Sequence, residues 1–246
     1  MSENKQVALI TGANKGIGFE TARQLGKLGI TVILGSRDAA RGDGAAAKLR
    51  AEGIDARPIK LDVTASKDRG AAVKFLQDNF GKLDILVNNA GIAEEGGWGK
   101  NTTSSTSADT LKKTFETNLF ALVAFTQALL PLIRKSSAGR IVNLSSILAS
   151  NTLHSDPNSP IYNSKAFAYD ASKAALNAFT IHLAHELQDT NIKVNSAHPG
   201  WVKTDMGTDA APMEIVDGAK TSVALATLPQ DGPNGAFIHL GKTLPW

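Results

Sequence analysis

Val7-Ala-Leu-Ile-Thr-Gly-Ala-Asn-Lys-Gly-Ile-Gly18 is the stretch of sequence that decides the fold. The apolar run up to Ile10 predicts a strand, and the glycine-rich turn leads into apolar residues at helical spacing, among them Ala22 and Leu25. This order begins a βαβ nucleotide-binding unit, in which glycines let the backbone approach a pyrophosphate and the helix start offers free N–H groups. Some glycine turns bind no ligand, but the position of this turn at the first strand-to-helix junction favours a dinucleotide. The residues expected to hold it are Gly12, Asn14, Lys15, Gly16, Ile17 and Gly18.

Strands and helices continue to alternate after this unit. The expected strands cover residues 31–35, 56–61, 83–87 and 140–146, and the expected helices cover residues 39–51, 66–80, 108–135 and 169–187. A chain of 246 residues without an internal repeat or linker fits one large α/β domain. We therefore expect a single domain over residues 1–246. Its expected fold is a Rossmann-type doubly wound parallel sheet of about seven strands with helices on both faces.

The composition favours a soluble protein without nucleic-acid or membrane partners. Lys and Arg total 26 against 23 Asp and Glu, and no basic run exceeds a pair, whereas nucleic-acid binding needs clustered cations. The chain has no cysteine, so it has no disulfide and no cysteine-based metal site. No apolar run approaches about 18 residues, and residues 1–6 lack the apolar core of a signal peptide. The expected location is the cytoplasm.

The end of the second expected strand indicates which dinucleotide is bound. An acidic residue about 20 positions after the glycines usually binds the ribose 2′-hydroxyl of NAD, and Asp38 has this spacing. Asp38 directly precedes an expected helix, however, and fits better as its N-cap. The strand end offers Ser36 and Arg37, and the glycine turn offers Lys15. Two cations without a carboxylate suit a 2′-phosphate and hence NADPH, although both cations would also suit a solvated surface.

Polar residues also follow the later strands. Asp62-Val63 and Asn88-Asn-Ala-Gly91 come directly after strands, and Ser145-Ser146 end the strand over residues 140–146. All three lie at the edge where open α/β sheets bind ligands. Asn118 lies within the long helix expected over residues 108–135, where asparagine has a poor propensity. Its apolar neighbours favour burial and a specific role for the amide.

Tyr169 and Lys173 are the first candidate pair for acid–base chemistry. They are four residues apart on an expected amphipathic helix and therefore share one of its faces. A cation within about 4–6 Å favours phenolate and lowers a tyrosine pKa by roughly 1–3 units. Taken alone the pair is weak support for catalysis, because this spacing is common on helix surfaces.

Together these motifs resemble the short-chain dehydrogenase/reductase family, over essentially the whole chain. The family's T-G-x-x-x-G-x-G stands at residues 11–18 and its N-N-A-G at residues 88–91. The remaining family motifs match Tyr169 to Lys173 (Y-x-x-x-K), Ser146, Asn118, and Pro199-Gly200 followed by Thr204. Each motif is weak by itself, but their order and spacing together make the resemblance specific.

The resemblance implies reduction of a ketone or aldehyde by NADPH. Tyr169 would give a proton to the carbonyl oxygen, Ser146 would hydrogen-bond that oxygen, and Lys173 would hold the nicotinamide ribose. Asn118 would hold a water that relays protons to Lys173. Residues that would contact the cofactor by resemblance alone are Asp62, Val63, Asn88, Ala90, Gly91, Pro199, Gly200, Val202 and Thr204.

This scheme requires a choice between two serines and a choice between two tyrosines. Ser145 and Ser146 point to opposite faces if both are extended, and the family pattern selects Ser146. Tyr162 competes with Tyr169, because most family members place the serine much closer to the tyrosine than Ser146 lies to Tyr169. We select Tyr169, because only Lys173 continues into the long helix, and we explain the extra length by an insertion at residues 154–163.

Such an insertion resembles that of the carbonyl reductase branch, which also shares Asn14-Lys15-Gly16 and a similar C-terminus. The branch implies varied, often bulky carbonyl substrates, and the insertion favours a monomer or homodimer over a tetramer. Substrate contacts are expected from residues 92–101, the insertion, Trp201, Met206 and Met213.

Alternative functions are a 3-oxoacyl-thioester or steroid reductase of the same family, and a non-catalytic dinucleotide sensor. His182 and His185 precede Glu186 in the order H-x-x-H-E, which is not the H-E-x-x-H of zinc helices. No metal site is therefore expected. His154 is expected on an exposed loop rather than against the substrate.

Overall fold

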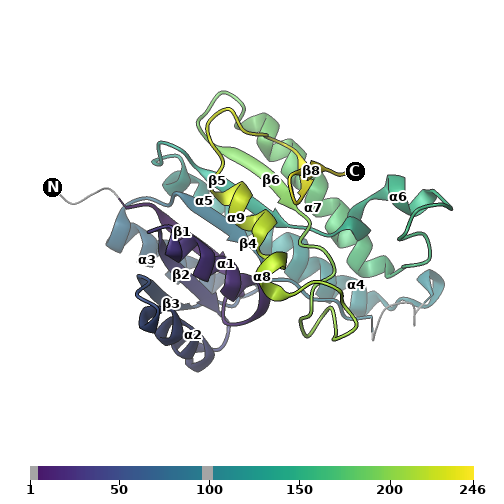
Figure 1. Cartoon of the computed structure of the whole chain (residues 1–246), viewed down its shortest axis with the longest axis horizontal. Coiled ribbons are helices and arrows are strands. Elements are labelled where there is room, and N and C mark those ends of the chain that lie inside the picture. Colours follow the sequence, from purple (N-terminus) through teal and green to yellow (C-terminus); the bar gives the residue numbers. More distant parts are fainter. Residues whose placement is uncertain (1–4, 96–101) are drawn as a thin grey trace.

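A largely parallel sheet forms the centre of the fold (Figure 1). The computed structural model describes residues 5–95 and 102–246. Its strands run in the order β3-β2-β1-β4-β5-β6-β7-β8, and all neighbours are parallel except β7 and β8. The strands are β1 (Val7–Thr11), β2 (Thr31–Ser36), β3 (Ala56–Lys60), β4 (Ile85–Asn88), β5 (Arg140–Leu144), β6 (Lys193–Ala197), β7 (Phe237–His239) and β8 (Lys242–Thr243).

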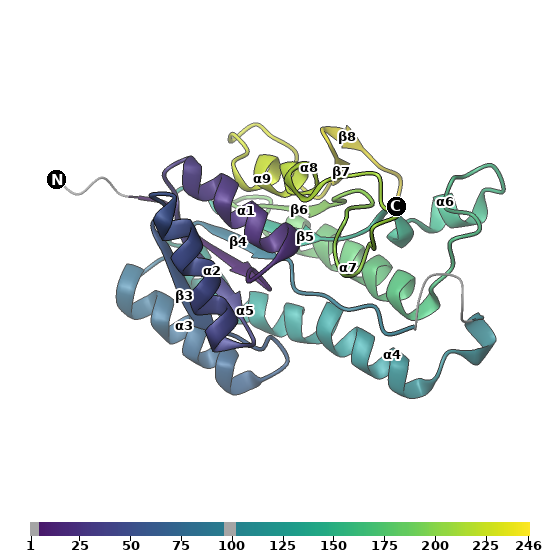
Figure 2. The same cartoon turned by 60° about the horizontal axis from the view of Figure 1, so that its bottom comes forward.

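Helices cover both faces of this sheet (Figure 2). One face is covered by α1 (Gly16–Lys27), α2 (Ala39–Ala51), α8 (Ile215–Gly218) and α9 (Lys220–Ala226). The other face is covered by α3 (Ser66–Phe80), α4 (Ala108–Phe115), α5 (Ala121–Ile133) and α7 (Phe167–Glu186). The short α6 (Asn151–Ser155) lies at the periphery. The doubly wound α/β fold expected from the sequence is confirmed, with an eighth, antiparallel strand added at the edge.

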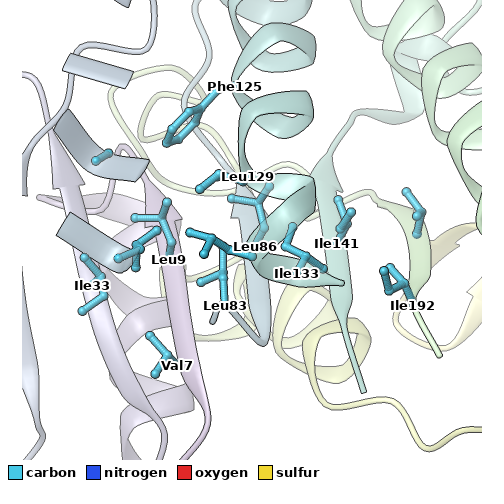
Figure 3. Packing of buried hydrophobic residues seen from close by; sticks show 14 of the residues in the cluster. Val7, Leu9, Ile33, Leu83, Leu86, Phe125, Leu129, Ile133, Ile141 and Ile192 are labelled. Atoms are coloured by element: carbon cyan, nitrogen blue, oxygen red, sulfur yellow. The ribbon is translucent and has the colours of Figure 1, made fainter. Parts of the chain in front are cut away.

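Alternate residues of the central strands build two separate cores. Val7 and Leu9 of β1 point to the face that carries α3, α5 and α7, whereas Ala8 and Ile10 point to the face that carries α1, α2 and α9. Figure 3 shows the first core, in which Phe125 of α5 packs over the sheet. Because both faces are buried, the strand reads as a continuous apolar run instead of an alternating one.

The strand order places a ligand crevice at the centre of the sheet. From β1 the chain first builds outward to β2 and β3 and then returns to the other side of β1 with β4. Loops that leave β1 and β4 at their carboxyl ends therefore diverge, and open α/β sheets bind ligands at such a switch point. The glycine turn after β1 and the Asn88–Gly91 segment after β4 both lie there.

The helix expected over residues 108–135 is interrupted. A π-helical segment, Glu116–Phe120, separates α4 from α5 and contains Asn118. Such segments add a residue to the helical ladder and often occur at functional sites. Ala108–Ile133 is long and apolar enough to cross a membrane by length and composition alone, but nearly half of it is buried in the fold. Its apolar face packs against the sheet as a core helix.

Candidate active site

The backbone of the glycine turn allows a ligand to approach it closely. Gly12 has φ +64° and Gly16 has φ +57°, both in the left-handed region that favours glycine. A Cβ on Gly18 would lie 2.4 Å from Asn89 Nδ2, so only glycine fits there. At Gly16 the nearest atom to an added Cβ is Thr204 Cγ2 at 3.6 Å, across the crevice. The turn therefore has the shape that a pyrophosphate requires beside the start of α1.

Asn89 holds this turn in place and was not singled out from the sequence. Its Nδ2 donates to Thr11 O at 2.8 Å and to Gly12 O at 3.2 Å. Thr11 Oγ1 in return accepts the backbone N–H groups of Asn89 and Ala90. The doubled asparagine of Asn88-Asn89 was the only signal, and its two members have different roles. Asn88 instead donates to Thr126 Oγ1 and Asn143 Oδ1 below the sheet edge.

The predicted capping role of Asp38 is confirmed. Its carboxylate accepts the backbone N–H of Arg41 at 3.0 Å at the start of α2. Ser36 is buried and donates to Asp38 O at 2.7 Å, which fixes the strand end. The exposed Arg37 lies close enough to Asp62 to help lower the pKa of that carboxyl, after the larger effect of a hydrogen bond from Thr64. The end of β2 thus presents the Arg37 cation, while the Asp38 carboxylate is already hydrogen-bonded to the start of α2.

Lys15 forms an ion pair with Asp205, and both side chains are exposed. This pair joins the glycine turn to the segment after β6, 190 residues away in the sequence. It therefore spans the crevice at its solvent edge. Because an exposed pair contributes little free energy, Lys15 stays available to an anionic ligand.

Three of the four predicted catalytic side chains meet at the carboxyl edge of β5. Ser146, two residues after the end of β5, is hydrogen-bonded through its side chain to Tyr169 on α7. Lys173 Nζ lies 5.8 Å from the centroid of the Tyr169 ring and donates to Leu144 O at 2.7 Å. Tyr169 and Lys173 thus share one face of α7, as their spacing predicted.

Asn118 borders the same site from the π-helical segment. It is fully buried, its Nδ2 donates to Ile92 O and Ser172 Oγ, and its Oδ1 accepts the N–H of Ile92. A Cβ on Gly91 would lie 3.3 Å from Asn118 Oδ1 and 3.4 Å from Lys173 Nζ. Both polar groups therefore border one small space that a glycine leaves open.

The expectation of a lowered tyrosine pKa is wrong for this structure. Burial raises the pKa of Tyr169 to about 12, the hydrogen bond from Ser146 opposes this rise, and the charge of Asp170 adds to it. Burial also lowers the pKa of Lys173 to about 8. Desolvation wins because both groups lie away from water and the ammonium bonds a carbonyl rather than the phenol oxygen. At neutral pH the phenol therefore keeps its proton.

Ser145 and Ser146 have different surroundings in the structure. Ser146 lies next to Tyr169, whereas the buried hydroxyl of Ser145 has no hydrogen-bond partner among the described residues. His198, after β6, supports the segment that begins at Ser146, because its Nδ1 accepts the backbone N–H of Ile147 at 3.1 Å. Burial lowers the pKa of His198 to about 3, which keeps this acceptor neutral. No pattern in the sequence indicated this contact.

The competing tyrosine lies outside this cluster. Tyr162 is 38% exposed in the segment before α7, and Lys165 Nζ lies 5.0 Å from its ring centroid. Lys165 Nζ contacts His154 Nδ1 at 3.0 Å. His154 Nε2 in turn contacts Leu148 O and Asp170 Oδ2. The expectation of an exposed loop histidine is wrong, because His154 belongs to α6 and contacts Asp170 of α7.

The remaining residues that were predicted to contact the cofactor or the substrate lie in the segment after β6. Gly200 has φ +93°, and a Cβ there would lie 2.2 Å from Met213 Sδ. Trp201 and Met206 are exposed, and Trp201 Nε1 donates to Gly207 O at 2.7 Å. Val202 pairs with Met213 in an isolated bridge. Residues 96–101, where part of a substrate wall was expected, lie outside the described residues.

The described part of residues 94–107 contains a buried carboxylate and a short helical turn. Glu95 is buried, with 4% exposure, and residues 103–105 form one turn of 3-10 helix. His182 and His185 are exposed on α7. Among the described residues, no group of three or more His, Cys, Asp or Glu side chains could hold a metal ion.

Comparisons with known proteins agree with this arrangement. The family described as short chain dehydrogenase matches residues 6–215. Mouse NADPH carbonyl reductase 1 is 34% identical over 284 aligned positions that cover 100% of both chains. The (+)-neomenthol dehydrogenase of Capsicum annuum is 31% identical, covering 94% of this chain and 95% of that protein.

Solved structures show the same fold. The NADPH-bound carbonyl reductase from chicken fatty liver superimposes with a TM-score of 0.85 and 27% identity. That match covers 98% of this chain and 99% of the chicken chain. Motifs, strand order and site geometry lead to one conclusion: the chain belongs to the short-chain dehydrogenase family.

Proposed function

We propose that the protein is an NADPH-dependent oxidoreductase that reduces a ketone or aldehyde to an alcohol. The observation that carries this proposal is the buried Tyr169, hydrogen-bonded to Ser146 and next to Lys173, at the sheet edge that also holds the glycine turn. The names of the carbonyl reductases that the chain resembles support the same reaction. The cytoplasm is the proposed location.

Tyr169 is the proposed proton donor. Its raised pKa keeps the phenol protonated, as a donor must be before the reaction, and the nearby Lys173 cation favours the negative charge that develops on transfer. Ser146 hydrogen-bonds the carbonyl oxygen as charge grows there. NADPH, when bound, supplies the hydride. Asn118 and Lys173 border the space left by Gly91, where a water could relay the replacement proton.

The residues of the crevice fit NADPH. The turn at Gly12 and Gly16 suits the pyrophosphate, while Arg37 and Lys15 provide cations for a 2′-phosphate. Asp38, the carboxylate at NAD spacing, is already committed to the start of α2. Tyr169 and Lys173 are positioned to meet the nicotinamide half.

Replacing each of the two tyrosines in turn by phenylalanine tests the proposed proton donor. Tyr169→Phe should lower kcat for NADPH-dependent reduction of aryl ketones and α-ketoesters by about 10²–10⁴-fold, because it removes a positioned acid. NADPH binding, measured by fluorescence titration, should be preserved. Tyr162→Phe is the matched control, since that ring is exposed outside the cluster, and its kcat should stay unchanged. The opposite pattern would assign catalysis to Tyr162, and tight NADPH binding without turnover of any carbonyl would favour a sensor.

Arg37→Ala tests the cofactor assignment. Loss of a charge-assisted bond to a 2′-phosphate should raise the KM for NADPH by about 10–100-fold, in line with roughly 1.5–3 kcal/mol for such a bond. The KM for NADH should change by less than about twofold, because NADH has no phosphate at that position. Steady-state kinetics with both cofactors gives the comparison within one variant. Equal changes for both cofactors would place Arg37 away from the 2′-phosphate.

A further inference from the structure

The catalytic helix α7 begins without a capping side chain of its own. Ala166 occupies the N-cap position and makes no side-chain hydrogen bond to the helix. The first turn of a helix leaves backbone N–H groups without partners inside the helix, and a Ser, Thr, Asp or Asn normally accepts one of them. Tyr169 is the third residue of this helix, so its backbone lies within the uncapped turn.

Glu95 supplies the missing cap from another part of the chain. Its Oε1 accepts the N–H of Ala168 at 2.9 Å, and its Oε2 accepts the N–H of Tyr169 at 3.1 Å. The two partners of the first bond are 73 residues apart in the sequence. Glu95 is only 4% exposed, and a carboxylate at a helix N-terminus also interacts favourably with the helix dipole. One side chain thereby fixes the backbone of the tyrosine itself.

A second carboxylate completes the turn. Asp170 Oδ2 accepts the N–H of Ala166 at 2.9 Å and lies 3.3 Å from His154 Nε2. Lys165 Nζ contacts His154 Nδ1 on the outer side. Asp170, His154 and Lys165 thus form a chain of polar contacts beside the first turn of α7.

We propose that Glu95 is a positioning residue for Tyr169, which holds the first turn of α7 and the phenol in the geometry for proton transfer. The inference rests on the proposed role of Tyr169 as proton donor. Helix ends are the parts of a helix that open most easily, and an uncapped first turn would let the phenol move. A misplacement of about 1 Å can lower a rate by about 10²-fold.

Two substitutions of Glu95 test this positioning role. Glu95→Ala removes both hydrogen bonds, and we expect kcat to fall by about 10–100-fold with the KM for NADPH changed less than about twofold. Glu95→Gln keeps the shape and one acceptor, so its kcat should fall less. Steady-state kinetics of both variants with varied NADPH gives kcat and KM.

Ser107→Ala is the matched control for loss of a helix cap. Ser107 is exposed, and its Oγ accepts the N–H of Thr110 at the start of α4. Ser107→Ala should lower Tm as loss of a cap does, and leave kcat and the KM for NADPH unchanged. The proposal is overturned if Glu95→Ala keeps kcat within about twofold, or if Ser107→Ala lowers kcat equally. If Tyr169→Phe stays active, it is the proposed function that fails.

Discussion

Tyr169 and Lys173 show how burial moves two neighbouring ionisable groups in opposite directions. Burial raises the pKa of the phenol to about 12 and lowers the pKa of the ammonium to about 8, since each charged form loses its hydration. Both shifts suit the proposed reaction. The phenol would hold a proton to donate, and the lysine would give up its own proton above a pH of about 8.

Asp170 gives a pH-dependent contribution to stability. Burial raises its pKa from 3.8 to about 7, so the folded protein binds more protons than the unfolded chain between these values. Wild-type stability should therefore decline as pH rises from about 4 through 7. Asp170→Asn keeps an acceptor for the N–H of Ala166 and cannot ionise. The free energy of unfolding of this variant, minus that of the wild type, should therefore rise steadily with pH over that range.

Urea denaturation at pH 5, 6, 7 and 8, values that bracket the pKa of about 7, measures this difference. A constant difference for Asp170→Asn over this range would show that this carboxyl ionises alike in both states.

At the scale of single elements, the sequence predicted what depends on local pattern. The start of α2 was placed correctly because Asp38 acts on the helix that directly follows it. The interruption at Asn118 was missed because a π-helical segment depends on contacts with Ile92 and Ser172, which lie in other elements. The cap of α7 was missed for the same reason. Periodicity reports neighbours along the chain, and Glu95 is a neighbour only in space.

Arg140 of β5 links one strand to two distant loops. It is 3% exposed, and its guanidinium donates to the carbonyl groups of Leu228, Asn191 and Gly139. Arg140→Met keeps the length of the side chain but leaves these acceptors without a partner. We expect a loss of about 2–4 kcal/mol in the free energy of unfolding.

Arg134→Met is the control for Arg140→Met. Its guanidinium forms an exposed ion pair with Glu186 at 3.5 Å, and such pairs contribute less than about 1 kcal/mol. Equal losses in the two variants would mean that the buried donors of Arg140 add nothing beyond a surface charge.

For the whole molecule, the fold class followed from the alternation of apolar strands and amphipathic helices. The antiparallel β8 was not expected, because two residues, Lys242 and Thr243, carry no strand signal. The pKa of Tyr169 was predicted in the wrong direction, since the sequence shows the spacing to Lys173 but not the depth of burial. Spacing identifies partners, whereas desolvation depends on the complete packing around them.

The association state is the prediction that belongs to the whole molecule. The segment over residues 154–163 lies against the start of α7, where His154 contacts Asp170. We expect this added bulk to favour a monomer or homodimer. Light scattering should give a mass of one or two chains of 25.9 kDa. A stable tetramer would contradict this expectation.

Trp246 is held against the fold, which affects where a tag can be attached. Its ring stacks on that of Phe237 in β7, with 5.6 Å between the ring centroids, and its carbonyl oxygen accepts hydrogen bonds from the N–H of Thr152 and the hydroxyl of Ser150 at the start of α6. An affinity tag placed directly after Trp246 would therefore press on α6 and, through His154, on α7. β1 begins at the opposite end of the molecule (Figure 1), so a tag placed before it stays away from α6 and α7.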